Sequence, residues 1–307
     1  EAYYVTGTWG TFGTLDKAVE AASDGDIIEV RTNEPATGRG GLRVPVGKSL
    51  TIRAAAGFRP VLQLQASGFP ALAVVDSNLV MEGFVFIHTT KALRAGRLIH
   101  VRGASMKLVK CRFVRQPRPP DAMQSTLHAL IAATDSPRIE VIDCEFYAPG
   151  SPLFGLIAES LERTDVSLTR CHLWGATVWC DDKPPAKLHV TMTDCEVFAT
   201  DVLHLHQALP AHELVLQADR NLIQAFGSAI HCPWPIAKLD SILQWTGQGN
   251  RWFLPGQVVI AQDGRRHELF GEKGSVLVRE LAMPFNQKDF EQALNPAHKL
   301  RIVAPKN

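Results

Sequence analysis

The sequence has no motif of the common catalytic folds and no segment suited to crossing a membrane. It contains no Gly-x-Ser-x-Gly elbow, no phosphate-binding loop, no dinucleotide fingerprint and no His-Glu-x-x-His pair, so the reaction classes that depend on these motifs have no support. No signal peptide and no apolar run near 20 residues is present. The net charge is +1, which argues against non-specific nucleic-acid binding through overall charge.

What the sequence does contain is an internal repeat. Seven segments share the pattern apolar-x-apolar-x-x-(Cys, Asn or Phe)-x-apolar, and the marked residue recurs every 24 to 33 residues. Alternation with period 2 indicates strands, and the step of three before the marked residue indicates a corner between two short strands. Repeats of this length are typical of the coils of a solenoid. The marked residues are Phe84, Cys111, Cys144, Cys171, Cys195, Asn221 and Asn250.

A further strand is expected ahead of each repeat. Several strands per coil, repeated along the chain, predict an all-β fold, a parallel β-helix whose open ends need covering. The expected strands are Ala71 to Val75, Arg97 to Arg102, His128 to Ala132, Phe154 to Ala158, Ala176 to Cys180, Val202 to His206, Ser228 to Cys232 and Gln257 to Ala261.

Two columns of charged residues support this stacking. Opposite charges on neighbouring strands attract, and like charges repel. We therefore expect ion pairs between successive coils, including Lys110 with Asp143 and Arg112 with Glu145. Alternating signs are found just before and just after the marked position, in Lys110, Asp143, Arg170, Asp194 and Arg220 and in Arg112, Glu145, His172 and Glu196.

Four of the six cysteines occupy the marked position, where they point inward. Cysteine is among the most often buried residues, and no Cys-x-x-Cys spacing occurs, so we predict buried free thiols rather than disulfides or a metal site. Asn221 and Asn250 continue the column and are expected to form a hydrogen-bonded ladder.

We predict a single domain over residues 1–307. Residues 1–30 form the N-terminal cap and first strand, 31–262 the coils and 263–307 the C-terminal cap. Thr14 is expected to N-cap a short helix from Leu15 to Ala22. A second short helix is expected from Asn286 to Leu294, followed by an edge strand from Leu300 to Val303.

The first 60 residues resemble a known family. The motifs are Phe12-Gly13-Thr14-Leu15-x-x-Ala18-Val19, Asp24-Gly25-Asp26-x-Ile28-Glu29-Val30 and Leu50-Thr51-Ile52-Arg53-Ala54-Ala55-x-Gly57-x-x-Pro60-Val61. They resemble the opening of right-handed parallel β-helix domains of the pectin lyase-like superfamily, and more narrowly the β-helices attached to bacterial serine/threonine protein kinases.

The resemblance implies a right-handed coil and a bacterial source. It also implies a larger parent protein with a covalently attached kinase or other module outside this sequence, because no kinase signature occurs in it. The start at Glu1 rather than Met is consistent with such a fragment or with a processed form. The compartment stays open, with the extracytoplasmic part of a membrane-anchored protein as one alternative.

The most suggestive polar cluster falls on one outward column of the later coils. We align Ile131, Ile157, Trp179, His204 and His231 in that column. Glu159, Asp181 and His206 lie two residues further on, with Asp182 and Trp234 nearby. The cluster therefore combines carboxylates, imidazoles and indoles on one face.

Four interpretations of this face stay open. Indoles stack on sugar faces while acids bind hydroxyls, which predicts carbohydrate binding through Trp179, Asp182, His204, His231 and Trp234. Paired acids also suit glycoside cleavage, with Glu159, Asp181 and His206 as catalytic residues. His204-x-His206 with His231 suits a metal. Alternatively, the isoleucines indicate a face covered by a loop, with a structural role only.

We predict a non-catalytic ligand-binding or sensing module for a polysaccharide or glycan, with no cofactor and no metal. A polysaccharide hydrolase or lyase is the alternative, and a structural scaffold is the second alternative. Uronate lyases of the resembled superfamily use a calcium cluster of acids with an Arg or Lys base, so calcium belongs only to the lyase alternative. No Asp-rich cluster precedes the Arg residues of this chain, which argues against that alternative.

Overall fold

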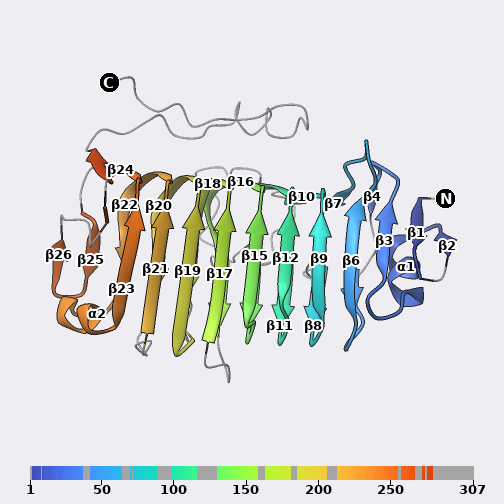
Figure 1. Ribbon diagram of the computed structural model, residues 1–307, viewed down its shortest axis with the longest axis horizontal. Coiled ribbons are helices and arrows are strands. Elements are labelled where there is room, and N and C mark those ends of the chain that lie inside the picture. Colours follow the sequence, from blue (N-terminus) through green and yellow to red (C-terminus); the bar gives the residue numbers. More distant parts are fainter. Residues whose placement is uncertain are drawn as a thin grey trace, which may run out of the picture.

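The structure is a computed structural model of the chain in which strands stack side by side as successive coils (Figure 1). This arrangement confirms the predicted parallel β-solenoid. No helix in the described part of the chain combines the length and apolar character that crossing a bilayer requires. The described residues are 2–7, 9–36, 42–63, 70, 72–88, 98–115, 130–157, 163–180, 185–205, 213–254, 257–266, 272–273 and 275–278.

One sheet of eleven strands forms a wall of the solenoid. Its strands alternate buried apolar and more exposed residues, as in β9, where Leu79 and Met81 are buried. All neighbours from β3 onward are parallel, whereas β1 pairs antiparallel with both β2 and β3. The order is β2(Gly10–Phe12), β1(Tyr3–Val5), β3(Ile27–Val30), β6(Ser49–Ala54), β9(Asn78–Glu82), β12(Met106–Val109), β15(Arg138–Ile142), β17(Arg163–Thr169), β19(Lys187–Thr193), β21(Glu213–Asp219) and β23(Leu243–Gln248).

The second sheet has sixteen strands and contributes two ladders to the coils. The ladder that follows the corner contains β4(Pro35–Ala36), β7(Val61–Gln63), β10(Val85–His88), β13(Arg112–Arg115), β24(Arg251–Phe253) and β27(Val276–Val278). The other contains β5(Leu42–Val44), β8(Leu72–Val75), β11(Ile99–Arg102), β14(Ile131–Thr134), β25(Val259–Ala261) and β26(Gly264–Arg266). Four longer strands run through both ladders, β16(Glu145–Ile157), β18(His172–Cys180), β20(Glu196–Leu205) and β22(Leu222–His231).

The step of three in the repeat is a sharp corner with a left-handed residue. At this corner, one residue of each coil takes a positive φ, between 51° and 81°, and the marked residue follows it. This conformation turns the chain between the two sheets and breaks the alternation of side chains. The corner residues are Gly83, Lys110, Asp143, Arg170, Asp194, Arg220 and Gly249.

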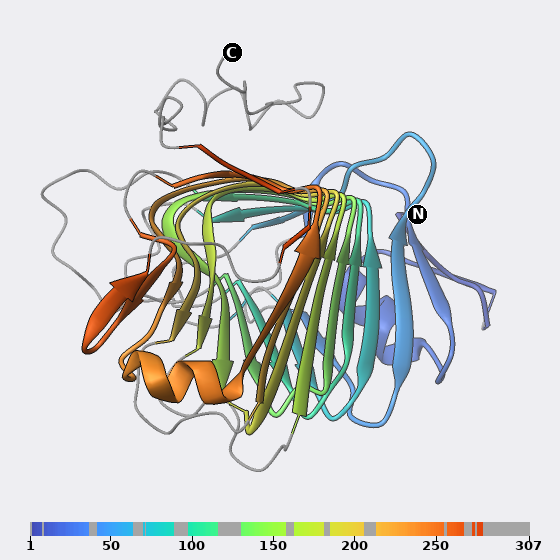
Figure 2. The ribbon, with the colours of Figure 1, turned by 60° about the vertical axis from the view of Figure 1, so that its left-hand side comes forward.

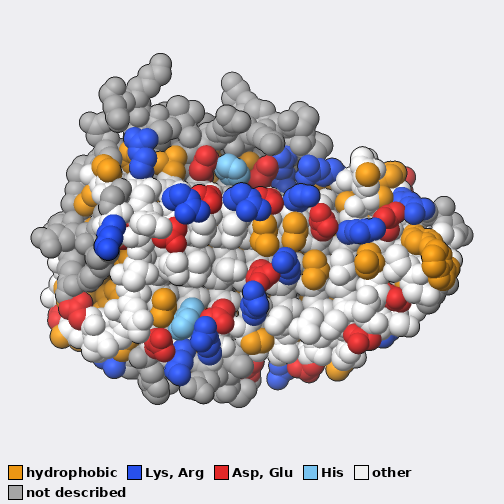
Figure 3. All heavy atoms as spheres, viewed as in Figure 1, with side chains coloured by type: hydrophobic (Ala, Val, Ile, Leu, Met, Phe, Trp, Pro, Cys, Tyr) orange, Lys and Arg blue, Asp and Glu red, His pale blue; other side chains and the backbone are white. Residues whose placement is uncertain are grey.

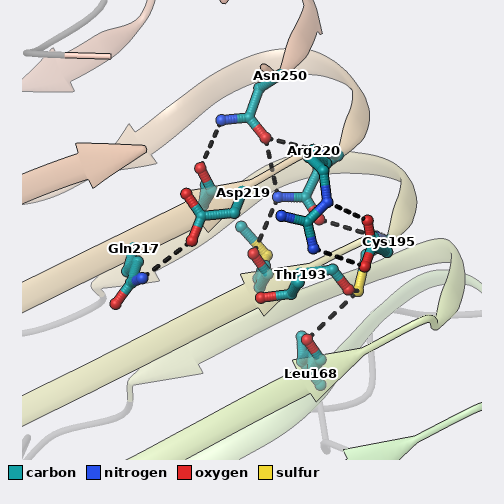
Figure 4. Close-up of polar contacts among 11 residues, drawn as sticks. Leu168, Thr193, Cys195, Gln217, Asp219, Arg220 and Asn250 are labelled. Carbon is teal, nitrogen blue, oxygen red and sulfur yellow. Dashed lines mark hydrogen bonds and ion pairs between the residues drawn. The ribbon is translucent and has the colours of Figure 1, made fainter. Parts of the chain in front are cut away.

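The seven marked residues form one buried column, as predicted, and none of them is more than 2% exposed. The backbone N–H of Cys111 donates to Cys144 Sγ at 3.3 Å. The N–H of Cys195 donates to Asn221 Oδ1 at 2.8 Å, and Asn221 N donates to Asn250 Oδ1 at the same distance. Figure 4 shows this part of the column. Cys144, Asn221 and Asn250 thus each offer an acceptor to the coil before them.

Five cysteines are free and buried, which confirms the prediction for them: Cys111, Cys144, Cys171, Cys195 and Cys232. Burial and the neighbouring Cys111 raise the pKa of the Cys144 thiol well above its usual value. Beside this column, Phe113 stacks between Phe86 and Phe146, with centroid distances of 4.4 and 4.5 Å. Stacked pairs of this kind add about 1 kcal/mol each to the free energy of unfolding, beyond their burial.

The charge columns form ion pairs between coils. Arg170 Nε lies 2.6 Å from Asp143 Oδ1, and Arg112 Nη2 lies 2.6 Å from Glu145 Oε2. Lys110, expected to pair with Asp143, instead lies 3.5 Å from Glu82 of the preceding coil, because Arg170 occupies the Asp143 carboxylate. Figure 3 shows acidic and basic side chains side by side along the upper edge of this face.

Two short helices lie at the two ends of the stack of coils (Figures 1 and 2). In α1(Leu15–Ala21), Thr14 Oγ1 accepts from the N–H of Lys17 at 3.4 Å, which confirms the predicted N-cap. The helix α2(Ile236–Ile242) was not predicted; Pro235 precedes it. The helix expected at Asn286 to Leu294 and the strand expected at Leu300 to Val303 lie outside the described residues.

Candidate functional site

Trp179, His204 and His231 do share one column of the second sheet. Trp179 on β18 pairs with His204 on β20, which pairs with His231 on β22. Gly155 precedes them on β16, and Ile260 follows on β25. The two imidazoles therefore come from neighbouring coils, and their ring centroids lie 4.4 Å apart.

The assignment of Ile131 and Ile157 to this column is wrong. Ile131 pairs with Phe154 and is fully buried, whereas Ile157 pairs with Thr134. The strand β14 begins at Ile131, three residues later than expected, and the register shifts with it. These isoleucines were the reason to expect a covered face, and that reason no longer applies.

Asp201 contacts both histidines, although the alternation of side chains along the strand predicts that it lies on the opposite face. Strand alternation would place Asp201 and His204 on opposite faces, because they are three residues apart. Between Phe198 and Leu203, β20 has one residue more than the paired part of β18, and the adjacent Val202 and Leu203 both pack in the core, which breaks the alternation there. The bulge brings the Asp201 carboxylate to the histidine side.

The neighbouring coil is shaped to hold this carboxylate. A side chain at Gly227 would bring its Cβ within 2.5 Å of Asp201 Oδ1, so the position needs glycine. Ser228 donates to the same oxygen twice, from its backbone N–H and from its Oγ hydroxyl, each at 2.8 Å. Oδ1 is thereby fixed, and Oδ2 is directed at the imidazoles.

Both imidazoles face Asp201 Oδ2 through Nδ1. The distance is 3.1 Å for His204 and 3.7 Å for His231. The side chains of Asp201, His204 and His231 are 8%, 17% and 41% exposed, respectively. The cluster therefore runs from a buried carboxylate to an imidazole at the protein surface.

The carboxylate is stabilised in its charged form. Burial alone would raise the pKa of Asp201, but hydrogen bonds from His204 and Ser228 and the nearby charge of His231 outweigh burial and lower it. A buried charge is costly unless it is paired, so these contacts are what makes Asp201 tolerable in this position. The result is an ionised acceptor that orients two imidazoles.

The other residues predicted for the site fall in different places. Glu159, Asp181, Asp182 and His206 lie outside the described residues. The backbone of Trp179 belongs to β18, at the ladder position next to His204. Trp234 is only 4% exposed and packs in the hydrophobic core, so its ring offers no platform at the surface.

Among the described residues, Asp201, His204 and His231 are the one group of three or more potential metal ligands close enough to share an ion, with one ligand atom of each within 4.8 Å of the others. Calcium prefers six to eight oxygen ligands. A group with a single carboxylate and two imidazoles does not match that preference, so it does not support the calcium of the lyase alternative.

Other histidines of the described chain make simpler contacts. His172 Nδ1 lies 3.0 Å from Glu196 Oε2, on the same strands β18 and β20. On the first sheet, His189 lies between Asp165 and Glu213 at 3.6 and 3.4 Å. None of these contacts brings a second imidazole, which sets the Asp201 cluster apart.

Comparison with known proteins adds no family assignment. No protein-family model matches the chain, and no curated protein matches it either.

Proposed function

We propose that this chain is a non-catalytic ligand-binding module and that its binding surface surrounds His204 and His231 on the second sheet. The observation that carries the proposal is the buried Asp201 carboxylate, which orients both imidazoles toward one point while His231 stays 41% exposed. A solenoid coil needs no such group for its stability, because apolar side chains fill this position at lower cost. The cluster is therefore better explained by a ligand.

A polysaccharide or glycan is the ligand class that we propose. Sugar hydroxyls both donate and accept hydrogen bonds, which suits imidazoles beside a carboxylate. Trp179 is the ladder neighbour of His204, and an indole there would add a stacking surface for an apolar sugar face. Successive coils repeat along the solenoid axis, so neighbouring sugar units would meet neighbouring strands.

We further propose that the module belongs to the pectin lyase-like superfamily and to a larger, kinase-containing bacterial protein. The support is the N-terminal motif, whose residues build the first coil. Gly25 takes a φ of 83° between Asp24 and Asp26, and both carboxylates accept backbone N–H groups at 2.7 Å, from Ser49 and Ser23. The motif thus favours the fold of that superfamily, and the kinase is inferred from resemblance alone.

A polysaccharide hydrolase is the second candidate, and a specific contact favours it. Asp201 Oδ2 lies 3.1 Å from His204 Nδ1. A carboxylate that orients an imidazole in this way is a common arrangement for general acid–base catalysis. In this candidate, His204 exchanges a proton with the glycosidic oxygen or with water, and Asp201 is the positioning residue.

Retention of polysaccharides tests the binding proposal. The purified chain is immobilised and challenged with neutral and uronate polysaccharides, beside the His231→Ala and His172→Ala variants. We expect retention of one polymer class by the wild type and by His172→Ala, with a roughly tenfold loss in His231→Ala, the size of about one lost hydrogen bond to a charged group. Equal retention by all three proteins, or none, contradicts a site at His231 and favours a scaffold.

The same incubation separates binding from hydrolysis. Oligosaccharides released from each polymer are followed by mass spectrometry for the wild type and for Asp201→Asn, which keeps the size of the side chain and removes its charge. Binding without release supports the module. Release that disappears in Asp201→Asn would establish the hydrolase in its place.

A further inference from the structure

The spacing of the Asp201, His204 and His231 donors matches a metal site. Tetrahedral zinc binds nitrogen and oxygen at about 2.0–2.1 Å, so two of its ligand atoms lie about 3.3 Å apart. The distances from Asp201 Oδ2 to Nδ1 of His204 and of His231 are 3.1 and 3.7 Å. These values lie on either side of the tetrahedral spacing, and one ligand atom of each residue lies within 4.8 Å of the others, so the three donors are close enough to share one ion.

The surroundings of Asp201 resemble the support that metal ligands receive. Ligand carboxylates are usually held by hydrogen bonds through the oxygen that does not face the ion. Here Ser228 N and Oγ hold Oδ1 at 2.8 Å each, and the missing side chain at Gly227 leaves room for it. The remaining oxygen, Oδ2, is the one that faces both imidazoles.

We infer that Asp201, His204 and His231 bind one divalent transition-metal ion of the zinc class. Two imidazoles and one carboxylate suit zinc, iron(II) or copper(II), whereas calcium and magnesium require oxygen ligands. Three protein ligands leave one tetrahedral position for water or for a ligand oxygen. That position lies toward solvent, since exposure rises from Asp201 through His204 to His231.

Metal binding by these three residues does not depend on the proposed carbohydrate ligand, and the ion would add a Lewis acid to the site. A zinc ion polarises a bound oxygen and lowers the pKa of bound water toward neutrality. Metal binding therefore goes beyond the proposed function and is tested apart from it. If a glycan also binds here, its hydroxyl or carboxylate oxygens would occupy the open position.

Titration with metal alone is the test. Zn²⁺ is added to the metal-free full chain in a calorimeter, and Co²⁺ is used in parallel because its absorption reports tetrahedral nitrogen and oxygen ligands. We expect one site that Ca²⁺ does not occupy. Affinity for Zn²⁺ should fall at least tenfold in His231→Ala and in Asp201→Asn, on the scale seen when ligands or their supports are removed.

The control is His172→Ala. His172 and Glu196 form a His–carboxylate pair of similar length, 3.0 Å, on the neighbouring ladder positions of β18 and β20, with similar exposure to His231. This variant should bind Zn²⁺ as the wild type does. Because His231 is at the surface, His231→Ala should keep the fold, which circular dichroism checks.

Absence of a Zn²⁺ site in the wild type, or a site whose affinity is the same in His231→Ala and Asp201→Asn, would overturn the inference. Polysaccharide retention is then measured with and without a chelator. Retention that persists without metal leaves the carbohydrate proposal standing while metal binding fails, so the two proposals fail separately.

Discussion

Two columns of residues run across the same coils, one inward and one outward. They differ in how much the residue type varies from coil to coil. The inward column repeats one role, a small side chain that accepts the N–H of the preceding coil, in Cys144, Cys195, Asn221 and Asn250. The outward column changes at each coil, from Gly155 through Trp179 to the two histidines and Ile260. The inward column therefore repeats one structural contact, whereas the outward column contains the imidazoles of the candidate site.

The difference has a physical cause. A backbone N–H in the inward column is sealed from water, and leaving it unpaired costs roughly 1–3 kcal/mol. Coils with such a buried N–H therefore need an acceptor in the same position. An outward residue meets solvent, so the backbone places no such demand on it. Polar groups in that column, such as His204 and His231, must then be explained by the contacts that they make.

Breaking the inward column should give the largest effect. Asn221 Oδ1 accepts from Cys195 N–H at 2.8 Å, and Asn221 Nδ2 donates to Met192 O at 3.0 Å. Asn221→Leu removes both contacts and leaves the buried N–H unpaired. We expect a loss of about 3 kcal/mol in the free energy of unfolding, measured by urea denaturation.

Asn221→Cys is the matched control. In the earlier coils a cysteine sulfur takes the place of the amide oxygen, as in Cys171 N–H to Cys195 Sγ at 3.5 Å. Extending the cysteine column by one coil should therefore cost only about 1 kcal/mol. Equal losses in Asn221→Leu and Asn221→Cys would show that the column is stabilised by packing rather than by its acceptors.

A substitution at the corner between the two sheets should have a smaller effect on the free energy of unfolding, and in the stabilising direction. Lys110 takes a φ of 51°, where Gly83 and Gly249 stand in other coils. A residue with Cβ is strained in this conformation, so Lys110→Gly should be more stable than Lys110→Ala by about 1 kcal/mol. Both variants lose the contact with Glu82. The difference between their stabilities in thermal unfolding therefore measures the backbone strain alone. Equal stability of the two would contradict a left-handed corner.

The inward column was the predictable part of this molecule. Its cysteines and asparagines recur at one position of every coil, and a buried position restricts residue type strongly enough to show in the sequence. The short helix near Ile236 was missed because it lies in the connection between two repeats, although Pro235 before an apolar spacing of three residues, Ile236, Leu239 and Ile242, is a helix signal.

The candidate site was only partly predictable, for geometric reasons. His204 and His231 follow from coil spacing, because strand alternation is regular around them. Asp201 does not, since the extra residue of β20 between Phe198 and Leu203 reverses its face, and no period-2 pattern contains that information. The adjacent Gly227 and Ser228 were the available signal, because glycine inside a strand often marks a bulge.

The smallest expected effect concerns the surface pair of His172 and Glu196, which contrasts with the buried Asp201 carboxylate of the candidate site. The hydrogen bond to Glu196 raises the pKa of His172 above its usual value, although burial partly opposes it. The pair therefore makes its full contribution to stability at pH values below the pKa of His172 in the unfolded chain, about 6.5. This contribution is lost as the pH rises through the higher pKa of His172 in the folded protein. The wild type should exceed His172→Gln by about 0.5 kcal/mol near pH 6 and by nothing near pH 9, after allowance for solvent screening. Urea unfolding at both pH values measures the difference, and a gap that stays constant with pH would mean that His172 contributes by packing instead of by charge.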